Sequence, residues 1–116
     1  MIRISRQQLA ERWALTYSQN GYEVRAEHVP CRRFPHTVAG IVPDLEATKG
    51  DETILVHIID SPESLGEAET RKELTALNDA RGDGTRLHVI VAAECAHAIK
   101  ERLDEWHVHA DLVHVT

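Results

Sequence analysis

Two side chains that could take part in chemistry stand on either side of a predicted turn. Asp44 follows Pro43 near the start of one expected strand, and His57 lies inside the apolar run of residues 54–59. If residues 49–52 turn the chain, Asp44 and His57 face the same side of a hairpin. A carboxylate and an imidazole so placed can hold two strands together, or they can supply two ligands to a divalent cation.

Other candidate ligands are spread along the chain. His107, His109 and Asp111 alternate in the C-terminal segment, a spacing that could chelate a transition metal. We favour the polar outer face of a half-exposed strand instead, because three consecutive side chains on a flat strand diverge. Glu11 lies on the first predicted helix, and we favour its interpretation as a solvated helix charge.

Charge argues against general binding to nucleic acid. The chain has 116 residues and a formal net charge of −6, whereas phosphate neutralisation by Lys and Arg supplies most non-specific affinity. Residues 1–40 nevertheless carry six arginines and three glutamates, a local balance of +3. Arg32 and Arg33 are adjacent in a segment with two prolines, which predicts an exposed basic loop at residues 29–36 and a candidate nucleic-acid contact.

The first half of the chain predicts a helix followed by a three-strand meander. Ser5 and Gln8 form a capping box, Ile4 and Leu9 a hydrophobic staple, and Asn20-Gly21 ends the helix that begins at Arg6. Alternating patterns predict strands at residues 22–28 and 38–47. The uninterrupted apolar run of residues 54–59 is typical of a central strand that is buried on both faces.

The second half predicts two further helix–strand units. Ser61-Pro62 starts a helix whose regular part Gly66 delays and which ends near Ala80. Residues 87–91 then form a strand parallel to the central one. A last helix has its apolar seam from Ala92 to Trp106, and residues 107–115 alternate as a final strand. The expected architecture is one α/β domain over residues 1–116, with a mixed sheet of about five strands flanked by helices.

The hairpin resembles the core of the PD-(D/E)XK nuclease superfamily, in which a Pro-Asp is followed across a hairpin by an acid, any residue and a lysine. Pro43-Asp44 matches the first part, while His57 stands at the second acid and Ile59 at the lysine. The resemblance implies the restriction-endonuclease-like fold, and the order helix, three-strand meander, helix, strand is similar to that core. Another small α/β sandwich is the alternative.

In that family the two acids hold Mg²⁺ and the lysine helps to activate water. A histidine in place of the second acid shifts the preference towards Mn²⁺ or Zn²⁺, and isoleucine cannot activate water. Some relatives supply the lysine from a neighbouring element, for which Lys49 and Lys72 are candidates. Some also carry an acidic residue on the first helix, and the resemblance makes Glu11 a less favoured candidate for an added metal ligand. Asp60 follows the lysine position and is expected to point to the opposite face.

The altered motif favours a catalytically inactive nuclease-like module with a binding or structural role and no cofactor. The alternative is a divergent metal-dependent nuclease that uses Asp44 and His57 with Mg²⁺ or Mn²⁺. A carboxylate or lysine near these two side chains favours the second interpretation, and an aliphatic wall favours the first. We further expect a cytoplasmic protein without membrane contact, a homodimer formed through an edge strand, and a weakly bound nucleic acid or protein partner.

Overall fold

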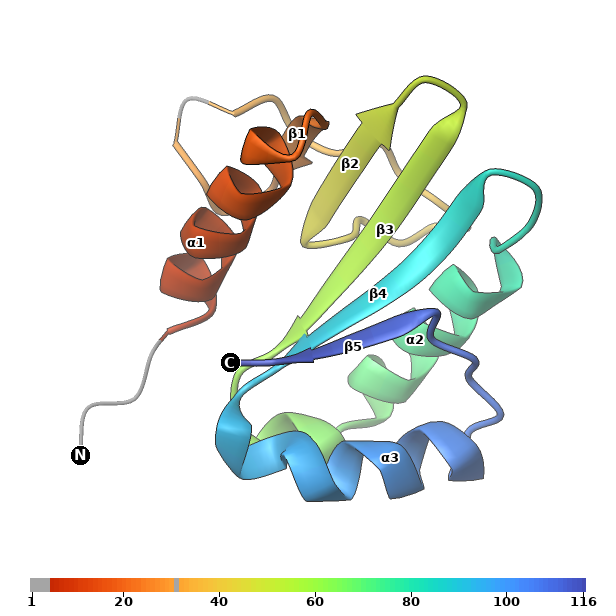
Figure 1. The fold of residues 1–116 in the computed structure, drawn as a ribbon. Coiled ribbons are helices and arrows are strands. Elements are labelled where there is room, and N and C mark those ends of the chain that lie inside the picture. The colour runs from red at the N-terminus through yellow and green to blue at the C-terminus, as the bar shows by residue number, and fades with distance from the viewer. Residues whose placement is uncertain (1–4, 31) are drawn as a thin grey trace.

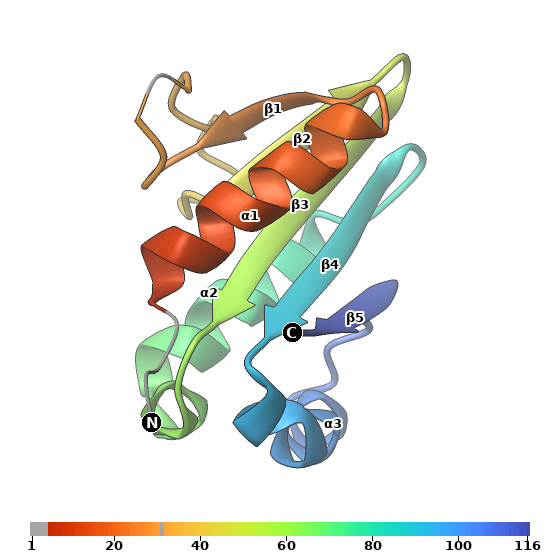
Figure 2. The same ribbon diagram turned by 60° about the vertical axis from the view of Figure 1, so that its left-hand side comes forward.

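A five-stranded mixed sheet forms the middle layer of the computed structural model, which describes residues 5–30 and 32–116 (Figures 1 and 2). The strands lie in sequence order, so that β1 and β5 are at the edges. β1, β2 and β3 pair antiparallel, whereas β3, β4 and β5 pair parallel. Their bounds are β1 Glu23–Ala26, β2 Leu45–Lys49, β3 Glu52–Ile59, β4 Thr85–Val91 and β5 Leu112–Val115.

Helices cover both faces of this sheet, which confirms the predicted α/β class. α1 (Arg6–Gln19) packs on one face, and α2 (Ala68–Asp79) and α3 (Ala96–Glu105) pack on the other (Figure 2). β3 alternates between the two cores, with Ile54, Val56 and Ile58 towards α1 and Leu55 and Ile59 towards α2 and α3. Both faces of β3 are covered, which is why its sequence is apolar without interruption.

The predicted limits of α1 are confirmed. The backbone N–H of Gln8 donates to Ser5 Oγ at 3.2 Å, and that of Ser5 donates to Gln8 Oε1 at 2.9 Å. Ile4, the other half of the predicted staple, lies outside the described residues. At the C-terminal end Gly21 adopts a φ of +92°, and the N–H of Tyr22 donates to the carbonyl of Tyr17, as in a Schellman motif.

The crossover from β3 to β4 also follows the prediction. Pro62 opens a short 3₁₀ helix, Pro62–Gly66, and regular α-helix begins only at Ala68. A second 3₁₀ turn, Ala93–Cys95, precedes α3. Within the described residues no helix is long and apolar enough to cross a lipid bilayer.

The second strand is shorter than predicted and begins later. It starts at Leu45 rather than residue 38, because residues 38–41 form a tight turn of their own. The N–H of Val38 donates to the carbonyl of Ile41 at 2.7 Å, and Ala39 and Gly40 between them have positive φ angles. Pro43, which has no N–H to donate, then precedes the ladder, as expected of proline at a strand end.

The prediction of a strand over residues 107–115 is wrong in its first half. β5 covers only Leu112–Val115, because α3 ends in a left-handed residue, His107, with a φ of 55°. The N–H of Val108 donates to the carbonyl of Leu103 at 2.9 Å, and that of His107 donates to the carbonyl of Asp104. These bonds form a Schellman motif that turns the chain, so His107 and His109 are not neighbours on one strand face.

Candidate functional site

Hydrogen bonds of both its backbone and its side chain fix the position of Asp44. Its N–H donates to the carbonyl of Val56, and its own carbonyl accepts from the N–H of Glu27. β3 extends beyond the start of β2, so the N–H of Ile58 has no strand partner there. Asp44 Oδ2 accepts from this N–H at 2.7 Å, and the residue is only 4% exposed. Asp44 Oδ1 is left to face the cleft described below.

His57 lies beside Asp44, as the predicted hairpin register requires. Leu45 pairs with Val56, and the N–H of Asp44 donates to the carbonyl of the same Val56, which places Asp44 beside the part of β3 that contains His57. His57 Nδ1 is 3.7 Å from Asp44 Oδ2, too far for a hydrogen bond. The residue is 2% exposed, and its Nε2 has no hydrogen-bond partner among the described residues. Burial lowers the pKa of His57 despite the opposing effect of Asp44, so the ring is neutral at pH 7.

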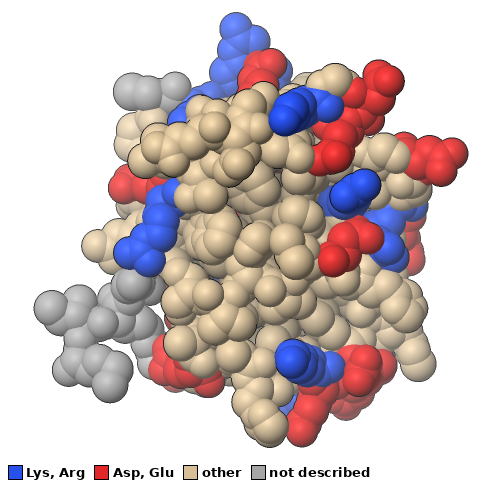
Figure 3. Space-filling model, viewed as in Figure 1, with Lys and Arg blue, Asp and Glu red and all other residues tan. Residues whose placement is uncertain are grey.

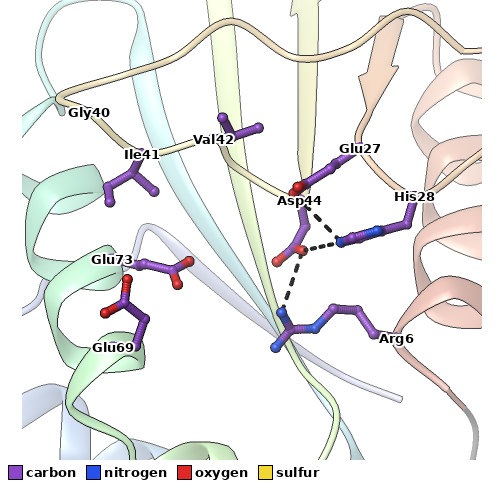
Figure 4. A pocket seen from close by; sticks show the side chains of 9 residues that line it. All are labelled: Arg6, Glu27, His28, Gly40, Ile41, Val42, Asp44, Glu69 and Glu73. Atoms are coloured by element: carbon purple, nitrogen blue, oxygen red, sulfur yellow. Dashed lines mark ion pairs between the residues drawn. The ribbon is translucent and has the colours of Figure 1, made fainter.

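A carboxylate from α2 approaches the same nitrogen of this imidazole. Glu73 Oε2 is 3.9 Å from His57 Nδ1. Burial and, second to it, the negative charge of Asp44 raise the pKa of Glu73. Glu69 lies one helical turn earlier and lines the same cleft (Figure 4).

The chain just beyond β1 adds a histidine and another carboxylate. His28 Nε2 is 3.5 Å from Glu27 Oε2 and 4.0 Å from Asp44 Oδ1. One ligand atom from each of these three residues lies within 4.8 Å of the other two. Glu27 and His28 are exposed, whereas Asp44 is buried, so the cluster opens to solvent on one side.

Arg6, at the first turn of α1, places a cation beside this cluster. Its Nη1 is 3.9 Å from Asp44 Oδ1, and its Nη2 is 3.7 Å from Asp60 Oδ1. The guanidinium therefore stands between the carboxylate that precedes β2 and the one that follows β3. Asp60, predicted to point away from the site, shares this cation with Asp44.

Asp44 and the charged side chains around it line one open cleft of about 330 Å³, which we call the acidic cleft. Glu69 and Glu73 project into it from α2, while Arg6 and His28 reach in from the opposite side towards Asp44 (Figure 4). Among the described residues four carboxylates face one arginine, so these side chains carry an excess of negative charge. The lining residues of the cleft are Arg6, Glu27, His28, Gly40, Ile41, Val42, Asp44, Glu69 and Glu73.

Other sequence-predicted candidates lie elsewhere. Glu11 is exposed on α1 and accepts a hydrogen bond from Gln7. Asp111 is held by Arg81 through two hydrogen bonds of 3.0 and 2.9 Å and accepts the N–H of Leu87, so it is not available as a metal ligand beside His109. Arg32 and Arg33 do lie in an irregular loop, with Arg33 exposed and Arg32 half-buried.

Neither candidate lysine reaches the acidic cleft. Lys49 Nζ donates to the carbonyl of Asn20 at 3.1 Å, at the end of the hairpin away from Asp44. Lys72 is exposed on α2 and does not line the cleft, and Ile59 is fully buried in the core beneath α2 and α3. Arg6 is thus the cation that the described residues place next to Asp44.

Five charged or histidine side chains of the acidic cleft were not singled out from sequence as site residues: Arg6, Glu27, His28, Glu69 and Glu73. The positions of Glu27 and His28 could have been anticipated, because the chain after β1 runs antiparallel to the segment that contains Asp44. Glu73 follows Glu69 at the i, i+4 spacing that places two carboxylates on one helix face, but many exposed helices show the same pattern.

Comparisons of this chain with protein-family models, with curated proteins and with solved structures find no match. The function has to be inferred from the side chains that the fold brings together.

Proposed function

We propose that this protein is a divergent metal-dependent nuclease related to the PD-(D/E)XK superfamily. The observation that carries the proposal is the convergence of Glu27, His28 and Asp44, whose ligand atoms lie within 4.8 Å of one another at the edge of the acidic cleft. Carboxylates close to Asp44 and His57 are the feature that distinguishes this interpretation from an inactive module. The order of elements and the hairpin register support the superfamily assignment.

The donor set fits a divalent cation of intermediate softness. Two carboxylates and one imidazole are ligands that Mn²⁺ and Zn²⁺ accept, whereas Mg²⁺ prefers oxygen ligands alone. The cation would be held by Glu27, His28 and Asp44. When bound, it would polarise a phosphodiester oxygen and lower the pKa of a coordinated water.

The remaining cleft residues have properties that suit phosphodiester hydrolysis. Glu73 has a raised pKa, which makes its carboxylate a better proton acceptor near neutral pH than an exposed glutamate. Arg6 can donate from two nitrogens to the oxygens of a phosphate and so offset its negative charge. His57 is neutral and enclosed, and its Nδ1 lies 3.7 Å from Asp44 Oδ2 and 3.9 Å from Glu73 Oε2.

A second candidate function is the catalytically inactive module that binds a partner. The observation that favours it is the complete burial of Ile59, which stands where the superfamily has its lysine. In this case the hydrogen bond from Ile58 to Asp44 is a structural remnant that holds β3 to the preceding segment.

Cleavage assays with paired variants separate the two functions. We expect the wild type to cleave single-stranded or plasmid DNA with Mn²⁺, and Asp44→Asn to reduce the rate at least about 100-fold. The asparagine oxygen can still accept the N–H of Ile58, so the variant is expected to fold. His28→Ala should weaken activity and raise the Mn²⁺ concentration required.

His97→Ala serves as the matched control, because His97 is an exposed histidine on α3 away from the acidic cleft. It should cleave like the wild type. Absence of cleavage with Mn²⁺, Zn²⁺ and Mg²⁺, or cleavage that persists unchanged in Asp44→Asn, would contradict the nuclease and leave the inactive module.

A further inference from the structure

A second cleft, of about 350 Å³, lies on the face of the sheet that carries α1. We call it the aromatic cleft. It lies between α1 and strands β4 and β5, whereas Glu69 and Glu73 of the acidic cleft come from α2, which covers the other face. Its lining residues are Trp13, Thr16, Tyr17, Asn20, Tyr22, Lys49, Ile54, His88, Leu112 and His114.

Five flat rings meet around this cleft. The ring centroids of Trp13 and His114 are 4.3 Å apart, and those of Tyr17 and His88 are 5.9 Å apart. The Tyr17 hydroxyl is 2.7 Å from His88 Nδ1, which joins α1 to β4. Tyr22 stands edge-on to Tyr17, and its hydroxyl donates to Glu52, which fixes the ring at the mouth of the cleft.

Both imidazoles in the cleft are uncharged at neutral pH. Burial lowers the pKa of His88 to about 4, and it also lowers the pKa of His114. Neutral imidazoles stack on other rings without bringing a charge into the cleft. The walls therefore offer flat, uncharged surfaces with polar edges.

The charges around the aromatic cleft differ from those of the protein as a whole. The chain has a net charge of −6, yet none of the described residues that line this cleft is a carboxylate. Glu52 lies at its edge and accepts the hydrogen bond from the Tyr22 hydroxyl. Lys49 Nζ lies 5.4 Å from the centroid of the Tyr22 ring, and the positive charge of Arg86 on β4 opposes the effect of Glu52 on the pKa of Tyr22. The middle of this face shows uncharged side chains, with charged ones towards its margins (Figure 3).

We propose that the aromatic cleft binds an unpaired base of a single-stranded nucleic acid, with Lys49 and Arg86 next to the adjoining phosphates. Aromatic side chains stack on bases of any sequence, and nearby cations follow the backbone. The choice of nucleic acid over another flat ligand rests on the proposed function. The binding itself requires neither a metal ion nor cleavage.

Tryptophan fluorescence of the full chain provides the test. Trp106→Phe leaves Trp13 as the reporter, and oligo(dT) is added at low salt with EDTA present so that no strand is cut. We expect saturable quenching that weakens as salt is added. The mononucleotide dTMP should quench with lower affinity, because it lacks the neighbouring phosphates.

Three substitutions in this background locate the contact. Tyr22→Leu should raise the dissociation constant about 5- to 150-fold, the loss expected for one stacked base, while Tyr22→Phe retains the ring and should restore binding. Arg86→Glu should weaken binding and reduce its salt dependence, whereas Lys100→Glu, an equal change of charge on α3, should not.

Any of three results would overturn the proposal. The first is that oligo(dT) produces no saturable quenching of Trp13 fluorescence. The second is equal affinity for dTMP and oligo(dT), and the third is an unchanged affinity for oligo(dT) in Tyr22→Leu. Asp44→Asn should bind oligo(dT) as the wild type does. Loss of cleavage with retained binding in this variant therefore agrees with both the nuclease and the aromatic cleft. Loss of binding in Asp44→Asn would instead place the nucleic-acid contact in the acidic cleft and contradict the proposal.

Discussion

Replacing His57 by leucine should stabilise the protein, although the residue lies beside Asp44 of the candidate site. His57 Nε2 is buried without a hydrogen-bond partner among the described residues, and Nδ1 is 3.7 Å or more from the carboxylates beside it. An unsatisfied buried polar atom costs about 1–3 kcal/mol, and leucine fills a similar volume without that cost. We expect the free energy of unfolding to rise by about 1–2 kcal/mol.

Acid should enlarge this difference. The pKa of His57 is lowered in the folded protein, so below the ordinary value of 6.5 the unfolded chain takes up a proton that the folded protein does not. The wild type therefore loses stability as the pH falls through this range, and His57→Leu is spared that part of the loss. Urea denaturation followed by far-UV circular dichroism, at about pH 7.5 and about pH 5.5, measures both effects.

His88→Leu is the matched control for this experiment. His88 is also buried in the sheet, on the neighbouring strand β4, but its Nδ1 is 2.7 Å from the Tyr17 hydroxyl. The substitution leaves that hydroxyl unpaired, and we expect a loss of about 1–3 kcal/mol. If His57→Leu instead destabilises the protein by more than about 1 kcal/mol, His57 is a structural partner of Asp44 and not a residue kept at a cost to stability.

Three further predictions concern other parts of the molecule. His107→Gly should raise the free energy of unfolding by about 0.5–1 kcal/mol, because glycine adopts the left-handed conformation at the end of α3 without strain; a loss in thermal denaturation would contradict the Schellman motif there. We also expect a homodimer through β5, an edge strand, which a light-scattering mass of 13.1 kDa at high protein concentration would exclude. If the loop after β1 contacts DNA, charge reversal at Arg32 and Arg33 should lower the affinity and its salt slope, and unchanged titrations would rule the loop out.

The hairpin was predictable because its pattern is local. The turn at residues 49–52 sets the register of the two strands that follow and precede it, and this register brings the segment with Asp44 beside the part of β3 that contains His57. The limits of α1 were predictable for a similar reason, since the capping box and Gly21 act within a single turn. Where a residue type fixes the conformation of the backbone around it, the limits of an element can be predicted from the sequence alone.

The rest of the acidic cleft depends on how separate elements pack. Arg6 reaches Asp44 only because the first turn of α1 lies beside the end of β3, and no local pattern contains that information. Glu73 is one of several acids on α2, and only the rotation of the docked helix turns it towards His57. The length of the final strand was overestimated, because the alternation of polar and apolar residues begins at residue 107, before the strand does. Residues 107–111 are irregular, since the hydrogen bonds that end α3 and the bond from the N–H of Leu87 to the side chain of Asp111 fix their backbone.

Isothermal titration with Mn²⁺ tests the central claim most directly. The wild type is expected to bind one Mn²⁺ per chain at neutral pH, with Asp44→Asn and His28→Ala each raising the dissociation constant at least about tenfold and His97→Ala leaving it unchanged. A wild-type protein that binds no Mn²⁺, or one whose affinity is the same in all three variants, would contradict a metal site formed by Glu27, His28 and Asp44.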